Sequence, residues 1–238
     1  MTKSSSPHLA KRGAAAPVRR GRPPLGSSAL SRDVIVRAAV DVIDAEGVGA
    51  VSLRSVARRL GVDAKSLYNH IESKEALLDA VAELVLSRMV VPQQTGDLRT
   101  DLIAIAQAFR AAALSSHQEA ATLVLSRPVE SLANLAALEA TLAVFMQAGA
   151  KPDWAVHAVR ATLAYMTGTL LREASTGLTL GSDEPAIAGP REAALAGLGL
   201  PHVAQVAKAL SRLDHAREFD FGIRLLVDAF ARELSQKP

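Results

Sequence analysis

The segment 51–78, VSLRSVARRLGVDAKSLYNHIESKEALL, constrains the fold of this chain more than any other stretch. It opens on Ser52, a favourable N-cap, and continues with apolar residues spaced for one helical face: Leu53, Val56, Ala57 and Leu60. Gly61 provides the positive φ that ends such a helix, Val62 is expected to plug the turn, and Asp63 can cap a second short helix. The pattern predicts two helices crossing closely at a tight turn, a helix-turn-helix.

The second of these helices is expected to have a polar outer side. It has only about two turns, so it must be held by a neighbouring core, which leaves its outer side free to enter a DNA major groove. The outward residues are Lys65, Ser66, Tyr68, Asn69 and His70. The alternative is a set of core-forming helices without a DNA role, but a solvated surface more often carries Glu and Lys than Tyr, Asn and His.

The same segment resembles the N-terminal domain of the tetracycline-repressor (TetR) family. The family stretch G-V-x-x-x-x-L-Y-x-H corresponds to Gly61-Val62, Leu67-Tyr68 and His70, and Ser73-Lys74 with Leu77 matches the helix start that follows. The resemblance covers about residues 31–86. It implies an all-α, homodimeric transcriptional regulator that binds double-stranded DNA.

Particular DNA contacts are expected from the position of the second helix and from the resemblance, with a solvated side chain that makes no contact as the alternative for each residue. Lys65 is expected to donate to guanine, Ala64 to touch a thymine methyl group, and Arg54 to read bases from the preceding helix. Ser52 and Lys74 are expected to hold phosphates. The remaining contacts to bases and phosphates are assigned to Ser66, Tyr68, Asn69 and His70.

Charge is unevenly distributed along the chain. Residues 1–90 hold 14 Lys and Arg against 9 Asp and Glu, whereas residues 91–238 hold 13 against 15. The positive half is the one with the helix-turn-helix, as binding to nucleic acid requires.

The N-terminal residues 1–30 are predicted to be a disordered basic arm, because they contain six basic residues, no acidic ones and no apolar periodicity. Within them Arg19-Arg20-Gly21-Arg22-Pro23 resembles the core of an AT-hook, which predicts a minor-groove arm carried by Arg19, Arg20 and Arg22. A solubilising or non-specifically attracted tail is the alternative.

Composition argues against several other classes of protein. The chain has no cysteine, no hydrophobic signal core and no uninterrupted apolar run of membrane length, which predicts a cytoplasmic protein. Its six histidines are scattered without an H-E-x-x-H motif or a carboxylate at ligand spacing. We therefore expect no enzyme activity, no cofactor and no metal site.

The expected domains are a helix-turn-helix domain over 31–78 and a helical effector-binding and dimerisation domain over 79–238. Helix 31–46 precedes the motif with Ser31 as its expected N-cap, and a connecting helix runs from Ser73, its expected N-cap, to about Val91. Breakers predict a loop at 181–190 and further helices at 97–115, 118–125, 129–147, 153–176, 201–213 and 215–235.

The C-terminal half resembles the tetracycline repressors more loosely, through Ser126-Arg127-Pro128, Gly168 with Leu171, and Phe219-Asp220-Phe221-Gly222. Leu123 replaces the magnesium-coordinating His, and Arg172, next to Glu173, replaces a pocket glutamate. A metal–tetracycline complex is therefore not the expected effector, and a mostly apolar small molecule is. The resemblance assigns the pocket to Phe109, Leu123, Leu142, Phe145, Met146, Tyr165, Met166 and Thr169, with simple core filling as the alternative.

The last helix is apolar on several sides, and the stripe Phe219, Ile223, Leu226 and Phe230 is the predicted dimer interface. Burial of this helix within one subunit is the alternative. We therefore predict a TetR-type repressor released from a palindromic operator by an effector. The alternatives are a helical small-molecule-binding protein and an architectural DNA-binding protein driven by the basic arm.

Overall fold

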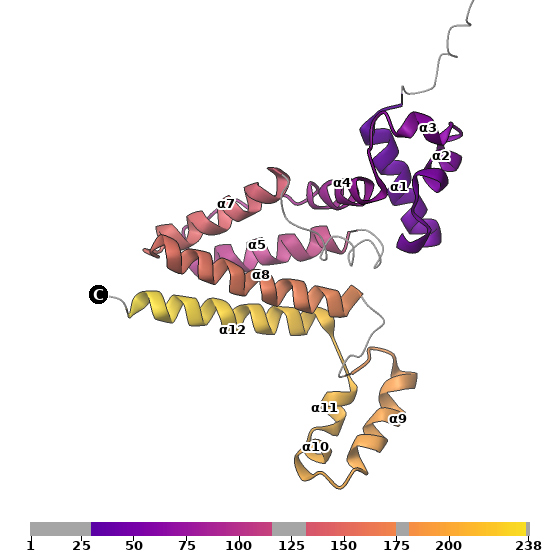
Figure 1. Cartoon of the computed structure of the whole chain (residues 1–238). Coiled ribbons are helices and arrows are strands. Elements are labelled where there is room, and N and C mark those ends of the chain that lie inside the picture. The colour runs from indigo at the N-terminus through magenta and orange to yellow at the C-terminus, as the bar shows by residue number, and fades with distance from the viewer. Residues whose placement is uncertain (1–29, 116–131, 175–180, 237–238) are drawn as a thin grey trace, which may run out of the picture.

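The computed structural model describes residues 30–115, 132–174 and 181–236, and the all-α prediction is confirmed (Figure 1). The described helices are α1 (Arg32–Glu46), η1 (Val48–Ala50), α2 (Leu53–Leu60), α3 (Ala64–Leu67), α4 (Lys74–Leu86), α5 (Leu98–Ala113), α7 (Leu132–Gln147), α8 (Pro152–Ala174), α9 (Pro185–Ala196), α10 (Pro201–Gln205), α11 (Ala207–Ser211) and α12 (His215–Ser235). None of them is long and apolar enough to cross a membrane.

The first core joins α1, α2, α3 and the N-terminal half of α4. The predicted N-caps are confirmed: the side chains of Ser31, Ser52, Asp63 and Ser73 each accept a backbone N–H of the following turn. Their helices bury Ile35, Val56, Leu67, Leu77 and Val81 completely or almost completely. A helix as short as α3 is stable here because Leu67 is anchored in this core.

Three details of this region differ from the predictions. Val62 does not plug the turn, since 37% of its surface is exposed. The helix α3 has a single turn of four residues. The helix α4 ends at Leu86 rather than Val91, because the hydrogen bonds beyond it tighten from the i−4 to the i−3 spacing. The N–H of Arg88 donates to the Val85 carbonyl at 3.2 Å, and the N–H of Met89 donates to the Leu86 carbonyl at 2.9 Å.

The second core is formed by α5, α7, α8 and α12, with α8 and α12 running antiparallel side by side (Figure 1). At one end, Phe145, Trp154 and Phe230 form three edge-to-face ring contacts with centroids 5.5 to 5.7 Å apart. The indole N–H of Trp154 donates to Glu233 at 2.8 Å, so the polar end of the ring is satisfied.

The helix α4 belongs to both cores. Its N-terminal half packs in the first core through Leu77, Leu78 and Val81, whereas Ala82, Val85 and Leu86 pack against Phe109 of α5. In Figure 1 it bridges the helix-turn-helix region and the larger helical body. Because α4 is one continuous helix, a movement of its C-terminal half relative to α5 would also shift the residues that it contributes to the first core.

The turn before α5 is held by one buried carboxylate. Asp101 accepts the backbone N–H of Thr95 at 2.8 Å, the Thr95 hydroxyl at 2.7 Å and the N–H of Gly96 at 3.0 Å. Burial by itself would raise the pKa of Asp101, but these hydrogen bonds outweigh it and hold the pKa below its ordinary value.

The helices α9, α10 and α11 form an arm that projects from the body at the junction of α8 and α12 (Figure 1). The predicted loop at 181–190 is wrong in its second half, because α9 starts at Pro185, where proline is compatible with a first helical turn. The helix predicted over 201–213 is broken at Val206 and ends at Ser211. At the base of the arm Ser182 bridges to the segment around Arg212.

Several predicted features lie outside the described residues: the basic arm up to residue 29, the helix over 118–125, and the ends of neighbouring helices at 129–131 and 175–176.

Candidate DNA-binding surface and ligand cavity

The turn between α2 and α3 has the geometry that a helix-turn-helix requires. Gly61 adopts φ 66° and ψ 30°, and the N–H of Val62 reaches back to the Ala57 carbonyl at 3.1 Å. Asp63 then caps α3 by accepting the N–H of Lys65 at 2.7 Å. The turn fixes α3 across α2 with Leu67 inward, which determines the side that faces solvent.

The solvent side of α3 and of the turn that follows it carries the residues that we name the α3 surface: Lys65 in the helix, and Tyr68, Asn69 and His70 in the turn. All four are exposed, and Tyr68 exposes 57% of its area although it is aromatic. Arg54 and Lys74 are exposed on the flanking helices. These positions suit contact with DNA, and the contacts themselves stay predictions.

Three other predicted contact residues have structural roles as well. The Ser52 hydroxyl accepts the N–H of Ser55 at 3.0 Å in a capping box, and the Ser66 hydroxyl donates to the Asp63 carbonyl at 2.5 Å. Ala64 is half-buried against the first core. Their DNA contacts also stay predictions.

Some basic residues of this region form ion pairs with carboxylates and others do not. Arg58 lies 3.7 Å from Glu46 and Arg59 lies 3.7 Å from Asp41. Arg54, Lys65 and Lys74 form no ion pair with any residue in the described ranges. Their charge is therefore available to a polyanion. The predicted minor-groove residues Arg19, Arg20 and Arg22 lie outside the described residues.

The larger body contains a mostly apolar cavity of about 370 Å³. It lies between the end of α4, α5, α7 and α8. The described residues that line it are Leu86, Met89, Leu102, Ile105, Ala106, Phe109, Ala137, Leu138, Thr141, Leu142, Val156, Val159, Arg160, Thr162, Leu163 and Met166. Its size and chemistry suit a small apolar molecule.

The predicted pocket residues are only partly brought together by this cavity. Phe109, Leu142 and Met166 line it. Four other predicted residues do not line it: Phe145 is fully buried in the aromatic cluster, Met146 is exposed, the Tyr165 hydroxyl donates to α12, and the Thr169 hydroxyl donates to the Tyr165 carbonyl. Leu123 lies outside the described residues.

Sequence reasoning missed most of the α8 wall. Val156, Val159, Arg160, Leu163 and Met166 recur at spacings of three and four, so they share one helical face. The sequence shows this periodicity, but periodicity alone does not distinguish a helical face packed into a core from one that lines a cavity.

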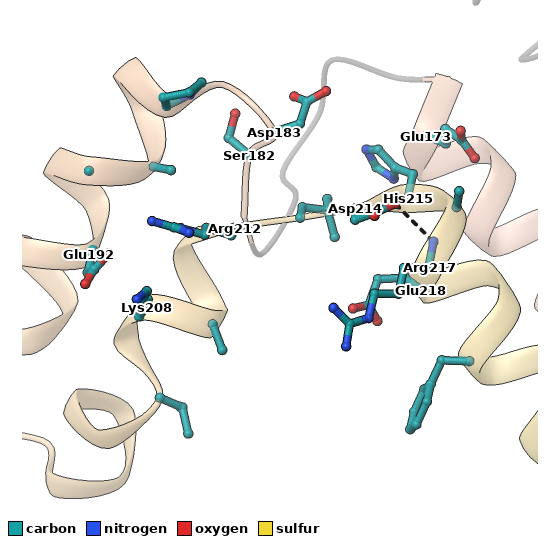
Figure 2. Close-up of a pocket in the computed structure, with 18 of the residues that line it drawn as sticks. Glu173, Ser182, Asp183, Glu192, Lys208, Arg212, Asp214, His215, Arg217 and Glu218 are labelled. Carbon is teal, nitrogen blue, oxygen red and sulfur yellow. Dashed lines mark hydrogen bonds between the residues drawn. The ribbon is translucent and has the colours of Figure 1, made fainter.

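A second and larger cleft, about 1400 Å³, lies between the arm and the junction of α8 and α12 (Figure 2). Charged side chains of both signs border it, including Glu173, Asp183, Lys208, Arg212 and Arg217. In the described residues no group of three or more His, Cys, Asp or Glu is arranged to hold a metal ion. This open, polar cleft suits an apolar molecule less well than the cavity beside α4.

One ion pair at the edge of this cleft links α5 to α8. Both Nε and Nη2 of Arg110 donate to the Glu173 carboxylate, the Nε bond measuring 3.2 Å, and both side chains are largely buried. The guanidinium also lies 5.8 Å from the ring centroid of Phe219 in α12. Glu173 therefore serves as the partner of Arg110. Its neighbour Arg172 stands at the position where the tetracycline repressors have a pocket glutamate.

The predicted dimer face on α12 needs correction. Phe219 and Ile223 are fully buried and Phe230 is nearly so, all within the core of one protomer, so these three are unavailable to a partner. Leu226 is half-buried against the same core. The exposed apolar residues of α12 are instead Phe221 and Leu225, with 62% and 54% of their areas accessible.

The short capped helix with an exposed polar side, joined through α4 to a helical body, defines a helix-turn-helix DNA-binding regulator. Comparison with known proteins supports this class of protein. Residues 35–81 match the family described as "Bacterial regulatory proteins, tetR family", and residues 91–233 match "Tetracyclin repressor-like, C-terminal domain". The chain belongs to the TetR family of DNA-binding transcriptional regulators.

Individual relatives resemble nearly the whole chain. The class A tetracycline repressor from transposon 1721 of Escherichia coli is 31% identical over 209 residues, covering 85% of this chain and 91% of the relative. The class G repressor of Vibrio anguillarum is 29% identical, covering 85% and 94%. Among solved structures, ActR of Streptomyces coelicolor in complex with actinorhodin has a TM-score of 0.76 at 22% identity, covering 88% of this chain and all of ActR.

Proposed function

We propose that this protein is a homodimeric repressor that binds a palindromic operator and leaves it when a small, mostly apolar effector enters the cavity beside α4. The observation that carries the proposal is the position of that cavity, because Leu86 and Met89, at the end of α4, form part of its wall. The helix that borders the cavity is also the helix whose first half packs against α1 in the core shared with α2 and α3.

Operator binding would use the α3 surface of each protomer. Two such surfaces must lie about 34–36 Å apart to meet successive major grooves, so the DNA site would be a palindrome with matching spacing. Lys65 would supply base contacts, and Arg54 and Lys74 would supply charge toward bases and phosphates.

Release would follow from a difference in effector affinity between two positions of α4. Leu86 and Phe109 meet at the edge of the cavity, so a molecule that fills the space between α5, α7 and α8 changes what α4 can pack against. The effector shifts the population only to the extent that it binds the released conformer more tightly. No chemical step is required.

The cavity lining supports an apolar effector. Most of its described residues are aliphatic, with Phe109 as an aromatic surface and Met89 and Met166 as adaptable side chains. The complex of ActR with actinorhodin is a precedent for a small molecule bound by a protein of this fold.

Dimerisation would use the outer sides of α8 and α12, which together could form a four-helix bundle across a two-fold axis. On α12 that side carries Phe221 and Leu225, and on α8 it carries the exposed small residues Ala161, Ala164 and Gly168. Small residues let helices of two protomers approach closely, while the two large apolar residues provide area to bury.

The proposal is tested by DNase footprinting on the DNA flanking the gene, followed by a small-molecule screen for loss of the footprint. The matched variant is Ala137→Phe, which fills the cavity from α7. We expect it to bind the operator like the wild type and to resist release by a molecule that releases the wild type. If the variant is released as easily, the cavity is not the effector site.

The same footprint separates the repressor from an architectural DNA-binding protein. A chain lacking residues 1–29 should keep its footprint with somewhat weaker affinity, whereas an architectural protein driven by the basic arm would lose it. A chain that shows no salt-dependent footprint at all would instead be a small-molecule-binding protein.

A further inference from the structure

One charged side chain borders the apolar cavity. Among the described residues that line it, Arg160 is the only one with a formal charge. It shares a face of α8 with Val156, Val159 and Leu163, and it is exposed to solvent. Arg160 therefore lies where the cavity opens to water.

The two hydroxyl groups of the lining cannot easily donate to a bound molecule. The Thr141 hydroxyl donates to the Ala137 carbonyl at 2.8 Å, and the Thr162 hydroxyl donates to the Ala158 carbonyl at 2.8 Å. Each hydroxyl has a single hydrogen, so both retain only acceptor capacity. The side-chain donors left to a ligand by the described lining are those of the Arg160 guanidinium.

Within the described part of the chain, no carboxylate neutralises the guanidinium of Arg160. It forms no ion pair with a described residue, whereas Arg110 is paired with Glu173 and Arg99 donates to Asp228 at 2.8 Å. No carboxylate lines the described part of the cavity. The charge that the described residues place at the cavity is therefore positive, which favours an anion and disfavours a cation.

From this arrangement we infer that the effector is an amphipathic anion: an apolar body that fills the cavity and a carboxylate, sulfonate or similar oxyanion that pairs with Arg160. The inference rests on the proposed function, because it specifies the ligand class of the same cavity. A guanidinium presents parallel N–H donors that match the two oxygens of such a group.

A pair of fluorescent probes that differ in one group tests the inference. Anilinonaphthalene sulfonate carries the anion, and phenylnaphthylamine is the same aromatic body without it. Both are titrated into the full-length wild-type protein and into Arg160→Gln, Arg160→Lys and Ala137→Phe. The control is Arg172→Gln, an exposed arginine of α8 that does not line the cavity.

We expect Arg160→Gln to weaken sulfonate binding about tenfold, as loss of a charge-assisted hydrogen bond predicts, and to leave phenylnaphthylamine within about twofold. Arg160→Lys should retain part of the sulfonate affinity, Arg172→Gln should change neither probe, and Ala137→Phe should weaken both.

Equal effects of Arg160→Gln on both probes, or no effect on either, would overturn the anion inference. If Ala137→Phe still weakened both probes, the cavity would remain the ligand site and the proposed function would stand. If Ala137→Phe affected neither probe, or the wild type bound neither, the cavity would not be a ligand site and both proposals would fail.

Discussion

The phenol of Tyr165 in α8 occupies the space that a side chain at position 222 of α12 would need. A Cβ atom on Gly222 would lie 2.2 Å from the Tyr165 hydroxyl oxygen and 2.4 Å from the ring carbon that bears it. The single hydrogen of the same hydroxyl is shared between the carbonyl oxygens of Glu218 at 2.9 Å and Phe219 at 3.0 Å. The glycine therefore sets how closely α8 and α12 approach.

The first prediction follows from this contact. Gly222→Ala should lower the free energy of unfolding by about 1–3 kcal/mol, because the tyrosine or α12 must move. The control is Gly189→Ala in α9, where an added Cβ meets no atom within 4 Å, and it should be neutral or stabilising. Denaturant unfolding measures both, and equal stabilities of the two variants would contradict the packing described.

The second prediction concerns acid stability. The pKa of Asp101 in the folded chain lies below its ordinary value, so this carboxylate stabilises the fold above the ordinary aspartate pKa of about 3.9. That contribution is lost as the pH falls through the folded pKa. Asp101→Asn should therefore destabilise the chain at neutral pH and flatten the dependence of stability on pH below about 5.

Thermal unfolding of wild type and Asp101→Asn across acidic pH measures this effect. The exposed Asp153→Asn is a suitable control, because Asp153 accepts no comparable set of hydrogen bonds in the described residues. A constant stability difference at every pH would mean that ionisation of Asp101 contributes nothing.

The third prediction concerns the pair between α5 and α8. Arg110→Met should destabilise the fold by about 1–3 kcal/mol, since it leaves the largely buried Glu173 carboxylate without its partner. Adding Glu173→Gln should recover part of that loss. A double-mutant cycle with the two single variants measures the coupling, and a coupling near zero would contradict a cooperative pair.

The fourth prediction concerns the dimer. Leu225→Asp should shift the protein from dimer to monomer, raising the dissociation constant by about 100-fold or more, because a carboxylate would be buried without a partner. Val90→Asp is the matched control, since Val90 is also exposed but lies between α4 and α5. Sedimentation over a range of concentrations reports both. An equally stable Leu225→Asp dimer would exclude this face.

Local signals in the sequence predicted local structure well. Ser31, Ser52, Asp63 and Ser73 were recognised as caps because capping depends on a few adjacent residues. The same reasoning failed at Pro185, since a proline that ends one helix is also compatible with the first turn of another.

The orientation of α12 could not be predicted in the same way. Phe219 and Phe221 are two residues apart and so face nearly opposite directions on a helix, and both sides of α12 carry large apolar residues. The side of α12 that packs into the core of its own protomer is decided by the positions of α5 and α8. The sequence periodicity of α12 carries no information about those positions. The structure buries Phe219 and exposes Phe221.

The cavity was the least predictable feature. A cavity is the space that packed side chains leave unfilled, so its lining depends on how four segments meet. Phe145 and Leu142 are one turn apart in α7 with similar chemistry, yet only Leu142 borders the space. Family resemblance located the region and three of the residues that line it, Phe109, Leu142 and Met166, but not the others.

The most direct test of the central claim is the affinity of Lys65→Ala for the footprinted operator, measured by fluorescence anisotropy against Lys151→Ala, an exposed lysine just before α8. We predict that Lys65→Ala binds about 1–3 kcal/mol more weakly and discriminates less between bases at the contacted position, while Lys151→Ala binds like the wild type. Binding by Lys65→Ala with wild-type affinity and wild-type base preference would contradict the assignment of α3 as the helix that reads DNA.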